Sequence, residues 1–207
     1  MLKLIIPEQL LEEFATIDTL WRSTGKTRRV DALMLSWVKY EKQLRRLFCF
    51  LLFQHSKIGA DKIDEVIAVL AENRRLYPET FIAGIEALGV TPVPDLLGSR
   101  YDKLWSEITR IKAYRNKLMH GQITGQGIKS PQLERDVLWI IEWIACVAAA
   151  ADRTFGYDGL KRNTYRAARS TSKISVGNYP FTTAAEFKTW LSELTKKCSK
   201  SSCNDFP

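Results

Sequence analysis

The chain has 207 residues, of which 45% are hydrophobic and 26% are charged, so it is long enough to bury one sizeable core. Lysine and arginine number 31 against 23 aspartates and glutamates, and the formal net charge of +8 favours contact with a polyanion such as RNA. No apolar run reaches the ~18 residues that a membrane span needs, and Met1–Pro7 is too short and polar for a secretory signal, so we expect a cytoplasmic protein without membrane contact.

Helical periodicity dominates the chain. Apolar residues recur three and four positions apart, and no alternating β-branched run with hairpin turns occurs between residues 1 and 158. This pattern predicts an all-α fold. The expected helices cover about residues 7–21, 30–54, 61–76, 78–88, 101–120, 133–155 and 182–194.

Turn and capping residues mark several of the helix ends. Gly89 and Pro92 break the helical pattern before the helix that starts near residue 101. Thr182 or Thr183 is expected to cap the last helix, because a hydroxyl oxygen can accept a hydrogen bond from a free backbone N–H. Residues 196–207 are polar and are expected to form a frayed tail.

The helix expected over residues 133–155 is apolar on almost every side, which is typical of the central helix of a bundle. Glu142 within it argues against a membrane span. We expect an N-terminal helix and basic loop over 1–29, a helical bundle over 30–158, and a basic C-terminal extension with a last helix and frayed tail over 159–207.

Two familiar kinds of site are excluded by missing residues. The stretch STGKT resembles the end of a phosphate-binding loop, but position 20 is Leu20 where that loop needs a glycine, and no strand precedes it. The two histidines and four cysteines show no metal-ligand spacing, so we expect no metal and no cofactor. The cysteines are interpreted as reduced, mostly structural thiols.

The stretch YRNKLMHG carries the strongest candidate for chemistry. Around the helix, Arg115 falls about 20° from Ile108, on the apolar stripe where a core residue is expected. A desolvated guanidinium is costly, so this position implies a carboxylate partner, a polar cleft or a phosphate ligand. His120 follows five residues later at the helix end, where the helix dipole favours the imidazolium.

A second polar residue breaks an apolar stripe on the helix expected over 30–54. Glu41 lies on the stripe that includes Trp37 and Leu44. It could meet Arg115 across the bundle, or it could pair with Arg45 one turn further along its own helix. The sequence leaves both alternatives open.

The arginine, the polar Asn116 beside it and the histidine at a helix end of an all-α bundle resemble the motif of the HEPN superfamily. Ribonucleases of that family carry an arginine, four to six intervening residues and a histidine. The stretch 30–138 also resembles the family arrangement, in which a long helix with a polar residue, here Glu41, packs beside the motif helix. The N-terminal helix and the residues after 155 are not covered, and residues 61–99 form an insertion.

The resemblance implies a HEPN-like bundle that acts as a metal-independent endoribonuclease, of the toxin or antiphage defence type. It also implies a homodimer whose two motifs face one groove, restrained by an antitoxin or a regulatory subunit. In the implied reaction the RNA 2′-OH attacks the phosphate and gives 2′,3′-cyclic phosphate and 5′-OH ends. His120 would move the protons, Arg115 would bind the phosphate, and Asn116 and Glu41 would orient the pair.

A basic stretch is expected to hold the RNA backbone, with a second basic group before the helix of residues 30–54. The members of the first are Lys161, Arg162, Arg166, Arg169 and Lys173, and those of the second are Lys26, Arg28 and Arg29. The alternative is that both groups only keep a surface solvated. His55 is interpreted as structural, or as a weaker candidate for a second site.

Two other functions stay open at the level of sequence. One is a non-catalytic HEPN-like dimer that binds RNA or a nucleotide and regulates a larger complex. The other is a helical interaction protein in which Arg115 and Glu41 form a buried ion pair.

Overall fold

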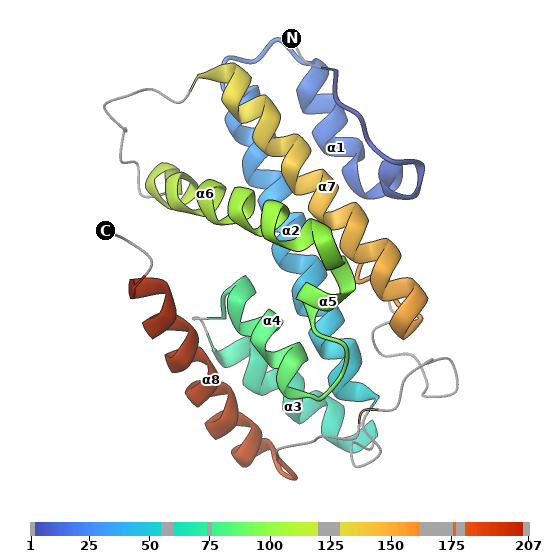
Figure 1. The fold of residues 1–207 in the computed structure, drawn as a ribbon, viewed down its shortest axis with the longest axis vertical. Coiled ribbons are helices and arrows are strands. Elements are labelled where there is room, and N and C mark those ends of the chain that lie inside the picture. The colour runs from blue at the N-terminus through green and yellow to red at the C-terminus, as the bar shows by residue number, and fades with distance from the viewer. Residues whose placement is uncertain are drawn as a thin grey trace. The chain divides into compact units, whose positions relative to one another are not determined.

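The computed structural model describes residues 3–54, 60–73, 76–119, 129–161, 176 and 181–204. Every regular element in these residues is a helix, which confirms the predicted all-α class. In chain order they are η1 (Glu8–Leu10), α1 (Leu11–Arg22), α2 (Arg28–Phe53), α3 (Ala60–Glu72), α4 (Pro78–Ala87), α5 (Val93–Leu97), η2 (Gly98–Arg100), α6 (Tyr101–Met119), α7 (Ser130–Phe155) and α8 (Ala184–Asn204) (Figure 1). Over the described residues, no helix is both long enough and apolar enough to span a bilayer.

The chain forms two compact units, each built from separate stretches of sequence. The first unit comprises Met1–Tyr40 and Leu97–Ala149, and the second comprises Glu41–Leu96 and Ala150–Pro207. All three boundaries fall inside helices, since α2, α5 and α7 each contribute residues to both units. The predicted division at residues 29 and 158 stays a prediction.

The core of the first unit is made by the apolar faces of α1, α6, the first half of α2 and the larger part of α7. Its fully buried side chains include Phe14, Ile17, Leu33, Trp37, Ile111, Val137 and Trp143. Tyr40 joins two of the tryptophans edge to face, with ring centroids 5.0 Å from Trp37 and 5.7 Å from Trp143. These aromatic contacts fix α2 against α7 within this unit.

Arg29 corrects one expectation from the sequence. Its side chain is buried, its Nε lies 2.8 Å from Glu134 Oε1, and its Nη1 donates a hydrogen bond to the Trp21 carbonyl oxygen. The guanidinium also stacks 4.0 Å from the centroid of the Trp21 ring. The prediction that Arg29 contacts RNA is therefore wrong, because this side chain ties α1, α2 and α7 together inside the core.

The second unit is centred on the aromatic side chain of Phe48 from α2. Its ring lies 5.8 Å from Phe81 of α4 and 6.3 Å from Trp190 of α8, measured between centroids. Gly84 lets α4 come close, since a Cβ at that position would lie 2.6 Å from the Phe48 ring. In this unit α3 and α4 both pack against α8 (Figure 1).

A tight turn follows α7 and is anchored on α2. Asp158 Oδ1 accepts hydrogen bonds from the backbone N–H groups of Leu160 and Lys161. From α2, the Gln43 side chain donates to the Asp158 carbonyl oxygen and the Arg46 side chain donates to the Leu160 carbonyl oxygen, at 3.2 and 2.7 Å. Within the second unit, these bonds hold the start of the basic C-terminal stretch against α2.

The observed helices follow the predicted ones with differences at the ends. The short helix α5 lies where a break was expected, and α3 ends at Glu72 rather than near residue 76. The prediction of a frayed tail is wrong as far as Asn204, because α8 continues to that residue. Its buried face extends through Thr195 and the half-buried Cys198, two small residues beyond the predicted end of the helix at residue 194.

Candidate functional site

Arg115 occupies the last turns of α6 in the first unit. Its side chain is half-buried, and its guanidinium carbon lies 5.4 Å from the ring centroid of Trp37, which is 1% exposed. Its Nη1 donates a hydrogen bond of 2.9 Å to Asn116 Oδ1. A guanidinium over a buried indole face gains cation–π attraction, so the arginine is held in a defined place rather than extended into water.

Helix geometry explains why an arginine reaches that place. Leu104, Ile108 and Ile111 form the buried face of α6. Arg115 continues that face one turn beyond Ile111, about 20° from Ile108 around the axis. There the guanidinium lies over the Trp37 ring from α2.

Several residues of the predicted site lie outside the part of the chain that the structure describes. They are His120, the second member of the motif, and His55, together with Arg162, Arg166, Arg169 and Lys173 of the basic stretch. Their predicted roles stay predictions. The described part of the motif comprises Arg115 and Asn116, whose side chains are in direct contact.

Glu41 is half-buried on α2, four residues after Trp37. It belongs to the second unit, whereas Arg115 belongs to the first. Its assignment to the same site as Arg115 therefore stays a prediction, as does the alternative pairing with Arg45.

Lys161 is the only member of the predicted basic stretch whose side chain falls within the described residues. It is 64% exposed, and its Nζ lies 3.8 Å from Asp152 Oδ1 and 3.6 Å from Asp158 Oδ2. Two carboxylates at these distances compete with an RNA phosphate for the ammonium group. Lys161 is thus a weaker candidate for phosphate contact than its sequence context suggests.

A charge network around the buried Asp136 joins α6 to α7. Arg110 Nη2 lies 2.5 Å from Asp136 Oδ1 and 2.6 Å from Glu107 Oε2, and Gln132 Nε2 donates to the same Asp136 oxygen. Burial raises the pKa of Asp136, and the hydrogen bond from Arg110 offsets part of that effect. Burial by itself would lower the pKa of Arg110, but its bonds to Asp136 and Glu107 outweigh it and raise that pKa.

Sequence patterns did not reveal this network. Asp136 interrupts an apolar helix and Glu107 precedes Arg110 by three residues, which are the available signals. Which arginine meets which buried carboxylate depends on how α6 packs on α7, and that pairing is not local in sequence. The network gives α6 a fixed register against α7 five residues before Arg115.

The described thiols differ in burial, since Cys49 is buried whereas Cys146 and Cys198 are half-buried. Burial raises the pKa of Cys49 to about 12, so this thiol stays protonated at neutral pH. Arg100 Nη1 donates to Cys146 Sγ at 3.2 Å on the surface of the first unit. Within the described ranges, no group of three His, Cys, Asp or Glu side chains is arranged to hold a metal ion.

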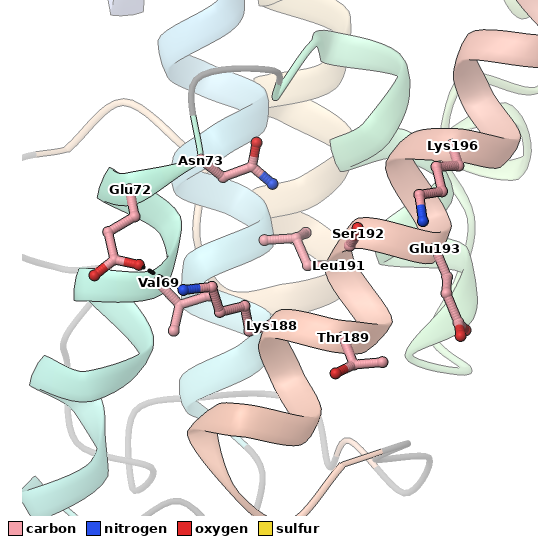
Figure 2. A pocket seen from close by; sticks show the side chains of 9 residues that line it. All are labelled: Val69, Glu72, Asn73, Lys188, Thr189, Leu191, Ser192, Glu193 and Lys196. Atoms are coloured by element: carbon pink, nitrogen blue, oxygen red, sulfur yellow. Dashed lines mark hydrogen bonds and ion pairs between the residues drawn. The ribbon is translucent and has the colours of Figure 1, made fainter.

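A cavity of about 740 Å³ lies between α3 and α8 in the second unit (Figure 2). Val69 and Leu191 contribute apolar surface to it, and an ion pair of 2.9 Å joins Glu72 to Lys188 across it. Glu193 and Lys196 add one charge of each sign. Because the charges around the cavity balance, it shows no preference for an anionic ligand such as RNA.

No family model, no curated protein and no solved structure matches this chain. The described feature that carries most chemical information is the guanidinium of Arg115, which is half-buried, oriented by an aromatic ring and next to a polar amide. Such a group can bind an oxyanion with little loss of side-chain entropy, because its position is set before the ligand arrives.

Proposed function

We propose that the chain is a metal-independent endoribonuclease of the HEPN type, with Arg115 and His120 as its catalytic pair. The observation that carries the proposal is the placement of Arg115, whose guanidinium is held against the Trp37 ring at the end of α6. The histidine of the motif follows five residues later in the sequence. The excess of basic residues supports a polyanionic substrate.

Each motif residue has a role that suits RNA cleavage. RNA supplies its own nucleophile, the 2′-OH, so the protein has only to transfer protons and to stabilise the negative charge that grows on the phosphate. His120 takes the proton from the 2′-OH or delivers one to the departing 5′-oxygen. Arg115 binds the nonbridging phosphate oxygens with two N–H groups.

In this proposal Asn116 and Glu41 orient the side chains of the catalytic pair, Arg115 and His120. The Asn116 amide oxygen already accepts a hydrogen bond from Arg115 Nη1, which limits the rotation of the guanidinium. Glu41 supplies a carboxylate that fixes either the imidazole or the guanidinium. The products are RNA ends with a 2′,3′-cyclic phosphate and a 5′-OH.

The assembly and the biological role form a further part of the proposal. Two copies of the chain bring their motifs to one groove, which gives the RNA strand arginines on both sides. An enzyme that cuts cellular RNA needs restraint, so an antitoxin or a regulatory subunit is the expected partner of a toxin or antiphage effector. A cytoplasmic location follows from such a substrate.

The first prediction tests the motif directly. Arg115→Ala and His120→Ala proteins are expected to cleave single-stranded RNA at least about a hundredfold more slowly than the wild type, because each removes a group that stabilises the transition state. The measurement is single-turnover cleavage of an end-labelled RNA with chelator present. Mapping of the ends should give 5′-OH termini for the wild type.

Arg22→Ala serves as the matched control for the first prediction. Arg22 lies in the same unit, is 76% exposed and pairs only with Asp18 one turn earlier in its helix, so its removal should leave the cleavage rate unchanged. Equal rates for wild type, Arg115→Ala and His120→Ala would refute the proposal. Binding of RNA without cleavage by any form would favour the non-catalytic regulator instead.

A further inference from the structure

One flank of α6 joins aromatic and basic side chains in a row that ends at Arg115. Tyr101, Trp105, Lys112 and Arg115 fall within a sector of about 80° around the helix axis, and we refer to these four residues as the α6 flank. All four side chains are half-buried. Tyr101, Trp105 and Lys112 border the fully buried face of Leu104, Ile108 and Ile111, and Arg115 continues that face at the end of the helix, where it is only half-buried.

The aromatic end of the α6 flank is rigid. The Tyr101 and Trp105 rings stack with centroids 5.9 Å apart and planes inclined by 10°. Both also contact the buried Trp143 ring, at 6.2 Å and 5.8 Å. Aromatic side chains fixed in this way can take up a planar partner at little cost in side-chain entropy.

We propose that the α6 flank binds single-stranded RNA, with bases against Tyr101 and Trp105 and the backbone running past Lys112 to the phosphate held by Arg115. The inference rests on the proposed function for the position of the scissile phosphate. It adds the path of the strand and the residues that hold it. Such a combination of aromatic rings and cations is the usual means of binding a single strand without reading its sequence.

Distances along α6 define the length of RNA that the α6 flank engages. Trp105 lies ten residues before Arg115, which is about 15 Å along the helix axis. Tyr101 lies fourteen residues before Arg115, which is about 21 Å. A stacked strand rises only about 3.4 Å per nucleotide, so a dinucleotide bound at Arg115 does not reach the rings. The bases in contact are therefore several nucleotides from the cleaved bond.

The charged side chains of the α6 flank favour the binding of a polyanion rather than contact with an acidic surface of the protein itself. Lys112 and Arg115 are the charged members, and Glu107 is engaged by Arg110 on another side of the helix. Asp102 is an exposed carboxylate on the same helix, about 60° from Trp105 around the axis. Asp102→Asn should therefore tighten the binding of RNA.

The test measures binding and cleavage separately. Binding of a labelled, 2′-O-methyl oligonucleotide of about 12 nucleotides, which has no free 2′-OH to react, is measured by fluorescence anisotropy. Trp105→Leu is expected to weaken binding about tenfold, within the range of one lost base–aromatic stack. Cleavage of a dinucleotide should keep its wild-type kcat/KM, whereas cleavage of the longer unmodified RNA should lose about tenfold.

Trp139→Leu is the matched control. Trp139 is also half-buried in the first unit, but it lies on α7 under the ammonium of Lys103, which projects about 160° away from Trp105 around α6. Its replacement should leave both binding and cleavage unchanged. Equal loss in the two tryptophan variants would overturn the proposal, because it would point to a general effect on folding.

A measurement on the unaltered protein covers the case in which Trp105→Leu fails to fold. Wild-type protein is photo-crosslinked to RNA that contains 4-thiouridine, and the modified peptide is sequenced by mass spectrometry. Crosslinks within residues 101–116 support the proposal, and crosslinks confined to other regions overturn it. If Trp105→Leu loses RNA binding but no form of the protein cleaves RNA, the nuclease activity is rejected and the RNA path along the α6 flank is retained. If Trp105→Leu binds RNA normally, only the RNA path is rejected.

Discussion

Gly159, in the turn after α7, lies where only glycine fits. Its φ is +80°, and a Cβ there would lie 2.8 Å from Leu47 Cγ and 2.9 Å from the Gln43 carbonyl oxygen. Gly159→Ala therefore combines a left-handed backbone penalty with a clash against the backbone of α2. We expect a loss of about 2–5 kcal/mol in the free energy of unfolding. Chemical denaturation followed by far-ultraviolet circular dichroism measures it.

Gly98 provides the control for this prediction. Its φ is +53°, but nothing lies within 4 Å of the position that a Cβ would take. Gly98→Ala should cost only the backbone penalty, about 1–2 kcal/mol. If both variants lose the same free energy, the close approach of Gly159 to α2 contributes nothing.

The arginines show how far single residues can be predicted from sequence. The inward direction of Arg115 follows from its angle to Ile108, and the same arithmetic places Arg29 on the stripe of Leu33 and Tyr40. The prediction that Arg29 binds RNA together with Lys26 and Arg28 did not take its position on this stripe into account. The partners of both arginines, Trp37 and Glu134, come from other helices, and helical periodicity carries no information about which helices meet.

At the scale of elements, the start of α8 is capped by side chains on both sides of the helix boundary. The Thr183 hydroxyl accepts a hydrogen bond of 3.2 Å from the Glu186 N–H, and Glu186 Oε2 accepts bonds from the Thr182 N–H and hydroxyl. These bonds lower the pKa of Glu186. The predicted cap, given as Thr182 or Thr183, is thus resolved to Thr183, with Thr182 binding the returning carboxylate.

Thr183→Ala is expected to destabilise the protein by about 1 kcal/mol, because the Glu186 N–H loses its acceptor. Thr189→Ala is the matched control in the same helix. The exposed Thr189 hydroxyl bonds only to the Ala185 carbonyl oxygen of its own helix, so alanine there should leave stability equal or slightly higher. Thermal unfolding of the two variants beside the wild type makes the comparison. If Thr183→Ala and Thr189→Ala unfold at the same midpoint temperature, the Thr183 cap does not stabilise α8.

Helix ends were harder to predict than helix positions for physical reasons. α8 runs past its last strongly apolar residues because Thr195 and Cys198 continue its buried face, and the Cys198 thiol lies 3.8 Å from the Glu79 carbonyl oxygen of α4. α5 forms in a proline-containing stretch, since Pro94 lies in its first turn and has no N–H to leave unpaired there. Such ends depend on tertiary contacts that local propensity does not describe.

For the whole molecule, the class of fold was predictable and the division into units was not. Helical periodicity is present in every long segment, so the all-α class follows directly from sequence. The unit boundaries fall after Tyr40, Leu96 and Ala149, within the continuous helices α2, α5 and α7. No glycine, proline or loop marks the boundaries in α2 and α7, whereas Pro94 and Gly98 lie beside the boundary in α5.

The pH dependence of stability is a whole-molecule property to which Asp136 contributes in a definite direction. Its pKa is raised by burial, so the folded state binds a proton at this carboxylate more readily than the unfolded state does. The stabilisation from this proton is complete below the ordinary pKa of an aspartate, about 3.9, and is lost as the pH rises through the higher pKa of the folded state. The free energy of unfolding of the wild type minus that of Asp136→Asn should therefore increase as the pH falls from about 7 to about 4.

The difference between the two proteins isolates this one group, because the other titrating residues are common to both. Glu107 and Arg110 of α6 are the charged neighbours of Asp136, and they act in opposite directions on its pKa. If pairing with Arg110 outweighed burial, the folded state would hold the proton less tightly and the difference would shrink towards acid pH. Denaturant titrations of wild type and Asp136→Asn at several pH values therefore decide which effect dominates. The sign of this pH dependence also shows the net effect of the Arg110–Asp136 pair on folding. A difference that increases towards acid pH means that the cost of burying the Asp136 charge exceeds the gain from the ion pair, and a difference that shrinks means the reverse.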